Sequence, residues 1–264
     1  MTRSKHRELW WAGATIGAST AVFLYLGLDG WPGAAHACVA IANCYCEAPR
    51  AGPIAQPANT WSCLGWAALG LWIAWDSEQR REHGSSPDSE LRPFASSFYA
   101  GLYAAIVILL ALGGMLFHSS LTEWGAKLDI VSMYLFVNFW IVYQLARSYS
   151  WSRRTFLCAY LGATALLLVP RVVFGSEDTG LAIFGALLAF AVATEFWISR
   201  SPHLRWIWLG LGAFGFAHLI QAVLPCDPDS LLQPHAVLHL IEVVPPVALY
   251  IHLFVATDSR ATTG

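Results

Sequence analysis

Residues 94–117 read FASSFYAGLYAAIVILLALGGMLF, a run of 24 residues without a single charged side chain. A helix needs about 20 consecutive apolar residues to cross the hydrocarbon core of a bilayer, so this run predicts a transmembrane helix. The same character extends over the whole chain, in which 56% of the 264 residues are hydrophobic and 12% are charged. Soluble domains carry about 25% charged residues. We therefore expect an all-α, multi-pass membrane helix bundle that forms one integral membrane domain over residues 1–264.

Hydropathy predicts eight transmembrane helices, separated by polar joints that contain Pro or Gly. Lipid offers the backbone no hydrogen-bond partner, so each spanning run must pair its backbone groups internally, as a helix does. No stretch between the runs is long enough for a soluble domain. The expected spans are residues 9–28, 59–75, 94–117, 128–146, 155–173, 180–199, 206–224 and 235–256.

The first run, residues 9–28, has a second interpretation. Three basic residues precede it, which is also the pattern of a secretory signal peptide. The Ala-His-Ala sequence at 35–37 resembles a cleavage site but lies several residues beyond the end of the run. Because the run approaches the length of a full span, we expect it to be retained as an extra N-terminal transmembrane helix within residues 1–30.

The distribution of Lys and Arg predicts the orientation. With the N-terminus inside, twelve of the 15 basic residues fall on the inner side, and the outer side takes Arg50, Lys127 and Arg171. Basic residues concentrate in cytoplasmic loops, so both termini are expected in the cytoplasm. Short tails and Ala-rich helices favour a bacterial inner membrane. The net charge of −2 and the lack of a basic stripe give no reason to expect a nucleic-acid partner.

Four of the six cysteines fall in the expected outer loops: Cys38, Cys44, Cys46 and Cys226. Disulfides form on the oxidising side of a membrane, so one or two bridges are expected there. Cys44-Tyr-Cys46 is alternatively a pair of metal ligands, but its spacing is one residue shorter than the usual Cys-x2-Cys.

Three histidines are predicted to meet at one depth near the outer side. His118 ends the third span, while His235 and His239 open the last one. Residues four apart in a helix lie on one face, about one turn from each other. That spacing suits two ligands of a tetrahedral Zn²⁺, and a third imidazole from another helix leaves the fourth position open, which is the catalytic pattern.

Asp129 lies just inside the fourth span, again at the outer end. An unpaired carboxylate facing lipid costs about 2.5–3.5 kcal/mol on insertion scales, which a nearby metal would offset. Asp129 is therefore the candidate general base for a water activated by Zn²⁺. Ser132 shares its helix face at i+3 and Tyr134 is close by, so these two complete the catalytic candidates.

Ordinary structural roles remain alternatives for each of these residues. A single interfacial histidine is usually a packing or snorkelling residue, and haem is the rival cofactor, although it usually takes single histidines from facing helices. We expect His218 to make a helix–helix hydrogen bond, and His252 and Glu195 to be structural. Glu242, one turn past His239, either orients that ligand or makes a plain buried polar contact.

Three sequence blocks carry a resemblance to a known family. The first is Tyr45-Cys46-Glu47 with Gln56-Pro-Ala-Asn59-Thr60-Trp-Ser62; the second is Phe117-His118 with Asp129 and Ser132-Met-Tyr134; the third is Cys226 with His235-Ala-Val-Leu-His239-Leu. At these blocks the chain resembles the alkaline ceramidases, in the wider superfamily of adiponectin-type receptors and Per1-like lipid-remodelling factors. The resemblance implies a seven-helix core over residues 45–256, preceded by the extra N-terminal helix.

The resemblance also implies a function. It implies that His118, His235 and His239 hold a catalytic Zn²⁺ and that Asp129 activates its water. The implied reaction is hydrolysis of the amide bond of ceramide-like lipids, taken from the bilayer, to a sphingoid base and a fatty acid. A disulfide between Cys46 and Cys226 is implied as well.

Two departures from the family pattern stand out. The family has Ser four residues before the first His, whereas this chain has Gly114, and Ser119 or Tyr134 are the candidates to replace that hydroxyl. The family's Ca²⁺ ligands are also mostly missing, so the resemblance gives little support for Ca²⁺ binding. Glu47 remains at one ligand position, and the others hold Cys44, Pro49 and Gln56.

Two further functions fit the same residues. One is a lipid-sensing receptor or scaffold in which zinc only braces the bundle. The other is a lipid-remodelling hydrolase that acts on ester-linked acyl chains, because an open three-histidine zinc site supports ester as well as amide hydrolysis.

Overall fold

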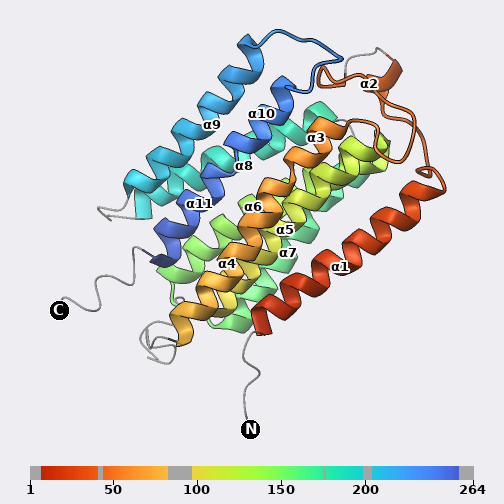
Figure 1. Ribbon diagram of the computed structural model, residues 1–264. Helices are drawn as coiled ribbons and strands as arrows, with labels where there is room; N and C mark the ends of the chain where they lie inside the picture. The colour runs from red at the N-terminus through yellow and green to blue at the C-terminus, as the bar shows by residue number, and fades with distance from the viewer. Residues whose placement is uncertain (1–6, 41–43, 83–96, 175–176, 199–203, 256–264) are drawn as a thin grey trace.

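The computed structural model describes residues 7–40, 44–82, 97–174, 177–198 and 204–255, and they form a bundle of roughly aligned helices (Figure 1). Within this part of the chain the only β pairing is an isolated bridge between Ala35 and Thr122. The expected all-α class is confirmed. The elements are α1 (Arg7–Leu28), α2 (Ala37–Ala40), α3 (Pro57–Ser62), α4 (Leu64–Glu82), α5 (Ser97–Ser120), α6 (Glu123–Ser148), α7 (Arg153–Phe174), α8 (Glu177–Ile198), α9 (Arg205–Val223), α10 (Pro234–Ile241), α11 (Val244–Tyr250) and a π-helical turn, η3 (Ile251–Val255).

Five helical segments among the described residues are long and apolar enough to cross a membrane. They are Phe98–Ser120, Glu123–Ser148, Thr179–Ile198, Arg205–Val223 and Pro234–Val255. The three other expected spans fall on helices that pack beside these five, α1 and α4 against α5 and α7 against α6. The charged residues of α4 lower its hydropathy, and the described apolar stretch of α1 is shorter. The predicted start at 94 and the predicted ends at 199 and 256 lie outside the described residues.

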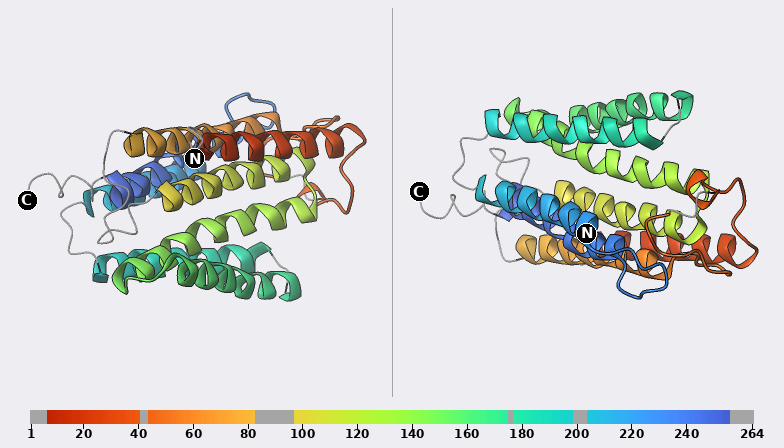
Figure 2. Two further views of the ribbon diagram at one scale, coloured as in Figure 1. Left: turned by 90° about the horizontal axis from the view of Figure 1, so that it is seen from below. Right: turned by 90° about the horizontal axis from the view of Figure 1, so that it is seen from above.

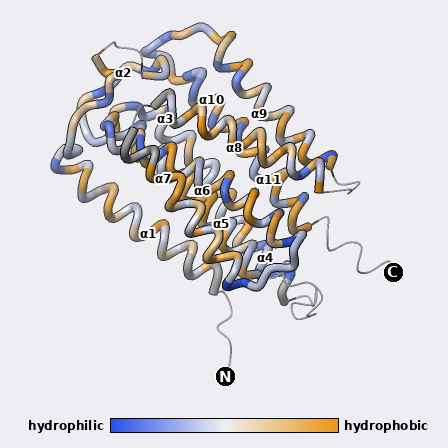
Figure 3. The backbone as a smooth tube through the Cα atoms, turned by 180° about the vertical axis from the view of Figure 1, so that it is seen from behind, coloured by the Kyte–Doolittle hydropathy of each residue, from blue (hydrophilic) through white to orange (hydrophobic). Residues whose placement is uncertain are grey.

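Hydrophilic residues gather toward the two ends of the bundle (Figure 3). Most described basic residues of the expected inner side lie at the end where α4 and α6 terminate: Arg80, Arg147, Arg153, Arg154 and Arg205. The opposite end holds Arg50 and Lys127. The expected inner residues Arg3, Lys5, Arg92, Arg200 and Arg260 lie outside the described part of the chain. Which end faces the cytoplasm stays a prediction.

The last expected span is broken close to its histidines. Pro245 and Pro246 have no backbone N–H, so the helical ladder cannot continue through them, and α10 ends at Ile241. Pro246 would otherwise have paired with the carbonyl of Glu242. The indole Nε1 of Trp66 donates to that carbonyl instead, at 3.0 Å. A side chain from α4 thus satisfies the backbone at the break, as an apolar environment requires.

Two disulfides lie at the end of the bundle where α10 begins. Cys46 and Cys226 are bonded, which confirms the pairing expected from the family, and Cys38 is bonded to Cys44. The alternative of Cys44 and Cys46 as metal ligands is therefore wrong, because both sulfurs are used in disulfides. The bridge from Cys46 joins the segment before α3 to the connection between α9 and α10.

A buried charged cluster ties three helices together at the opposite end. The Glu195 carboxylate on α8 accepts hydrogen bonds from Arg147 of α6 at 3.0 Å and from His252 of η3 at 2.8 Å. Trp140 donates to its other oxygen at 3.2 Å. Glu195 is fully buried, and these partners account for both carboxylate oxygens. His252 and Glu195 thus have the structural role expected of them.

Replacement of Glu195 by Ala leaves the Arg147 guanidinium without its buried counter-ion. Removing one partner of a buried ion pair costs about 3–5 kcal/mol, so we expect a clearly lower midpoint of thermal unfolding for Glu195→Ala in detergent. Arg154→Ala, which changes an exposed arginine at the start of α7, serves as the control. Equal midpoints for the two variants would contradict the structural role of the cluster.

Candidate metal centre

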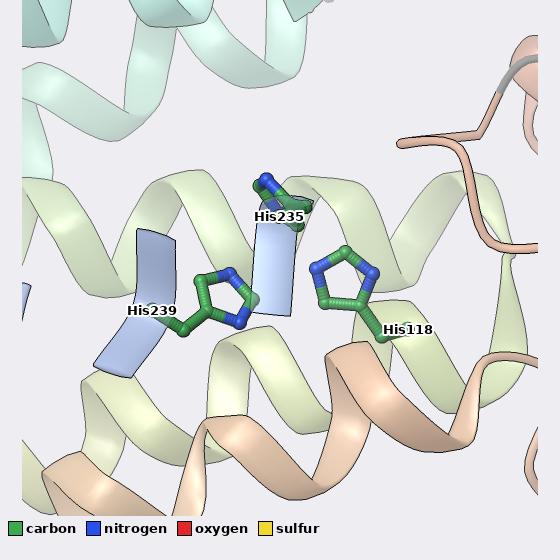
Figure 4. Close-up of side chains that lie close together, drawn as sticks. All are labelled: His118, His235 and His239. Carbon is green, nitrogen blue, oxygen red and sulfur yellow. The ribbon is translucent and has the colours of Figure 1, made fainter. Parts of the chain in front are cut away.

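His118, His235 and His239 converge as expected from the sequence. His118 comes from the last turn of α5, and the other two lie one turn apart on α10 (Figure 4). One ligand nitrogen from each ring lies within 4.8 Å of the others. A tetrahedral zinc with bonds near 2.0 Å requires these nitrogens about 3.3 Å apart, a change that side-chain rotation can provide. The group can therefore hold a metal ion.

The same convergence argues against haem. Two histidines can bind a haem iron from opposite faces of the porphyrin only if the space between their rings is free for the porphyrin itself. Here the third ring fills that region, with centroids 5.0 Å from His118 to His235, 5.2 Å from His118 to His239 and 4.3 Å from His235 to His239. Three imidazoles around one point fit a single ion.

Each of the three rings has its Nδ1 occupied by a polar side chain. His118 Nδ1 donates to Gln56 Oε1 at 2.9 Å, and His235 Nδ1 donates to Gln221 Oε1 at 3.4 Å. For His239 the partner is Ser62 Oγ, at 2.9 Å. The Ser62 hydroxyl donates its own proton to the carbonyl of Asn59 at 2.8 Å, so it accepts a hydrogen bond from His239 Nδ1. All three histidines are thus set as Nδ1–H tautomers, with Nε2 left as the metal-binding nitrogen.

Gln56 is held more firmly than the other two partners. It is fully buried directly before α3, and its Nε2 donates to the carbonyls of Glu47, at 2.7 Å, and Cys44. These two contacts fix which end of the amide is nitrogen, so Oε1 must face His118. The loop of residues 44–47 and the ring of His118 are therefore joined through one side chain. Sequence reasoning placed Gln56 only at a calcium-ligand position and missed this role.

The loop before α3 also supplies an aromatic wall. Tyr45 stacks on His235 with ring centroids 4.2 Å apart and meets His118 edge-on at 5.4 Å. Its backbone has φ of 57°, and that of Cys46 is 73°, which is the left-handed region that costs a residue with a Cβ about 1–2 kcal/mol. The disulfides of Cys44 and Cys46 flank Tyr45 and hold this conformation. A tyrosine between two bonded cysteines was the sequence signal for it.

The Glu47 side chain does not fit a calcium site. Its two carboxylate oxygens accept from the backbone N–H groups of Ala58, at 2.8 Å, and Asn59, at 2.9 Å, so it caps the start of α3. The carbonyls of Cys44 and Glu47 are occupied by the Gln56 amide. The remaining expected positions supply no second carboxylate, whereas Ca²⁺ takes 6–8 oxygen ligands. The Glu47 carboxylate and the carbonyls of Cys44 and Glu47 are thus already engaged within the protein.

Beside the histidines lies a cavity of about 750 Å³, the size of a pocket for a drug-sized ligand or larger. It runs between α6 and α8 on one side and α9, α10 and α11 on the other. Its polar residues gather at the metal end and include Asp129, His218 and Glu242. The rest of the wall is apolar, with side chains such as Met133, Phe184 and Leu211. The predicted general base thus shares one cavity with His235 and His239.

Ser132 and Tyr134, the two other catalytic candidates, do not line this cavity. The Ser132 hydroxyl donates to the carbonyl of Asp129 at 2.6 Å and faces a separate apolar groove between α1, α5 and α6. Tyr134 is buried, and its hydroxyl donates to the carbonyl of Gly180 at 2.9 Å, where it ties α6 to the start of α8. The structure does not bring either hydroxyl to the histidines.

The space beside Gly114 is filled by Cys63. A Cβ added at Gly114 would lie 2.9 Å from Cys63 Sγ and 3.7 Å from an Asp129 carboxylate oxygen. The buried thiol is itself 3.4 Å from His239 Nδ1. Ser119, the other candidate for the missing hydroxyl, donates to the carbonyl of Met115 and does not line the cavity. A thiol from the α3–α4 junction thus occupies the region where the family pattern places a serine.

Replacement of Gln56 by Leu removes the acceptor of His118 Nδ1–H together with both donors to the 44–47 loop. Losing such a partner of a metal ligand typically weakens metal affinity 10–100-fold, and we expect a loss of this size for Zn²⁺. Competition with a zinc indicator on purified protein measures it. Gln144→Leu is the matched control, because that amide is also buried but donates to Ala191 at 2.9 Å, far from the histidines. An equal loss in both variants would contradict the specific role of Gln56.

Comparison of the chain with protein-family models, curated proteins and solved structures found no match. The resemblance to alkaline ceramidases therefore stays a prediction from the sequence blocks of this chain.

Proposed function

We propose that this protein is a zinc-dependent intramembrane hydrolase that cleaves the amide bond of ceramide-like lipids. The observation that carries the proposal is the opening of a three-histidine centre into an apolar cavity that also holds a carboxylate, Asp129. A ligand set of three neutral imidazoles with one free position is the pattern of catalytic rather than structural zinc. When bound, Zn²⁺ would polarise a carbonyl and lower the pKa of a water toward ~7.

The protein's own residues have separable tasks in such a reaction. The Nδ1 partners of the three histidines keep Nε2 unprotonated and directed inward. Asp129, on the cavity wall, is the group that takes the proton of the attacking water and passes it to the leaving nitrogen. The apolar wall excludes bulk water from this proton transfer and shelters the hydrocarbon chains of the lipid.

The position of the cavity suits a substrate that arrives through the bilayer. α8 packs against α6, whereas α9 packs against α10 and α11, and the cavity lies between these two groups of helices (Figure 2). An amphiphile can therefore present its polar linkage at the metal end while its chains occupy the apolar part. We extend the proposal to location: the metal end faces the outer leaflet of a bacterial inner membrane, and both termini lie in the cytoplasm.

Two alternatives share the same centre. A lipid-sensing receptor or scaffold with structural zinc needs the histidines for folding only; a receptor would use the cavity to bind lipid, but Asp129 has no proton to transfer in it. A hydrolase of ester-linked acyl chains needs the same water and the same base. Amide hydrolysis is preferred on the ceramidase-like blocks, and the substrates tested below distinguish the two linkages.

The deciding experiment is a lipid hydrolysis screen with metal analysis on detergent-purified protein. The wild type is expected to bind one Zn²⁺ per chain and to hydrolyse ceramide, with loss of activity after chelation. Asp129→Asn should keep the metal and lose about 10²–10⁴-fold in rate, the contribution of a general base. His118→Ala should lose metal and activity together.

Glu123→Gln is the matched control for Asp129→Asn, since Glu123 is an exposed carboxylate in the first turn of the same helix. It should retain both metal and rate. Full zinc occupancy without turnover of any ceramide, acylated amino lipid or phospholipid would favour the scaffold. Turnover of the phospholipid alone would favour the ester hydrolase.

A further inference from the structure

Glu242 is a second carboxylate in the cavity, and the metal centre does not use it. It follows α10 directly, one helical turn or about 5 Å beyond His239 along the axis. Its backbone N–H still bonds to the carbonyl of Leu238 at 2.9 Å, so the helical turn that directs its side chain is intact. The break caused by Pro245 and Pro246 comes immediately afterwards. The carboxylate is thereby fixed on the cavity wall, deeper than the histidines.

No described group donates a hydrogen bond to this carboxylate. His218 of α9 lies beside it, with Nδ1 3.6 Å from Glu242 Oε1. The Nδ1 proton of that ring is directed elsewhere, to the carbonyl of Phe214 at 3.1 Å. Half of the His218 side chain is exposed, with a relative exposure of 53%. The ring therefore borders the polar end of the cavity without satisfying Glu242.

Apart from His218, whose Nδ1 lies 3.6 Å from Glu242 Oε1, the described residues around the cavity offer Glu242 no cationic partner. The described lining residues include two carboxylates, Asp129 and Glu242, but no lysine or arginine. A carboxylate at membrane depth is costly when unpaired, about 2.5–3.5 kcal/mol on insertion scales. A divalent ion held by the three histidines would lie about one helical turn from Glu242, since His239 precedes it by three residues.

We infer that Glu242, bordered by His218, forms a subsite that binds the ammonium group of a long-chain amine whose hydrocarbon chain lies along the apolar wall of the cavity. An ammonium group supplies three donors and a positive charge to a carboxylate that has neither nearby. The cavity provides room and apolar surface for the chain, with Phe184 and Leu211 on opposite sides.

Under the proposed function, on which this inference rests for its biological ligand, the amine is a reaction product. Hydrolysis of an amide by one water breaks the carbon–nitrogen bond, and the carbonyl carbon keeps the water oxygen as a carboxylate. The nitrogen leaves with the protons of the water and becomes an ammonium at neutral pH. Glu242 lies one helical turn from the metal end, where its carboxylate binds the newly formed ammonium group.

The test compares binding of hexadecylamine and hexadecanol to the purified full-length chain, followed by the fluorescence of the cavity tryptophans Trp66, Trp140 and Trp206. The wild type should bind the amine at least about tenfold more tightly than the alcohol, the value of one charge-assisted hydrogen bond. Glu242→Gln should abolish this preference. Glu242→Asp, which keeps the charge, should retain most of it, and so should the exposed control Glu123→Gln.

Thermal unfolding of each variant shows that the bundle is intact. An equal amine preference in wild type and Glu242→Gln would overturn the inference, whether or not the protein hydrolyses lipids. Amine preference that depends on Glu242 in a protein without any lipid hydrolysis would uphold the subsite and count against the proposed function alone. Ceramide hydrolysis without any preference for the amine would uphold the proposed function and count against the subsite alone.

Discussion

A primary amide carries one good acceptor and two donors on a rigid plane, and Gln56 uses both kinds of group at once. Its oxygen accepts from His118 while its nitrogen donates to the carbonyls of Cys44 and Glu47. Neither contact can be reversed, because carbonyl oxygens cannot donate. The tautomer of His118, a candidate metal ligand at the end of α5, is therefore set by a loop that precedes it by some seventy residues in sequence. The loop in turn is fixed by two disulfides and by the Glu47 cap on α3.

The polar groups of the bundle are sorted into two levels, and each level has its own means of satisfying them. At the metal end the histidines are satisfied by neutral partners, namely two amides and a hydroxyl. At the opposite end the Glu195 carboxylate is satisfied by Arg147, His252 and Trp140. Between the two levels the interior is mostly apolar and aromatic, and its buried polar groups, such as Asn138 and the Tyr103 hydroxyl, bond to neighbouring carbonyls. This division follows from the cost of unpaired polar groups in lipid.

Sequence reasoning succeeded where one strong physical rule dominates. Apolar length predicted the helices, the spacing of His235 and His239 predicted a shared face, and the family likeness predicted the Cys46–Cys226 bond. It failed where a small rotation decides the outcome. Residues at i and i+3 differ by about 60° around a helix, and Asp129 and Ser132 fall on opposite sides of the contact between α5 and α6. Gly113 receives Ser132 there, since a Cβ at that glycine would lie 2.6 Å from the Ser132 hydroxyl.

The break after α10 also separates the segment that carries two of the histidines from the segments that line most of the cavity. α10 is a short unit that packs mainly against α3 and α9, and its preceding connection is bonded to the loop that holds Gln56. The apolar part of the cavity wall is built from other segments, chiefly α6, α8 and α11. Substitutions in that wall alter the shape offered to a hydrocarbon chain without moving the imidazoles. Under the proposed function, a lineage of such proteins can thus change the chain length that it accepts while the three histidines are inherited intact.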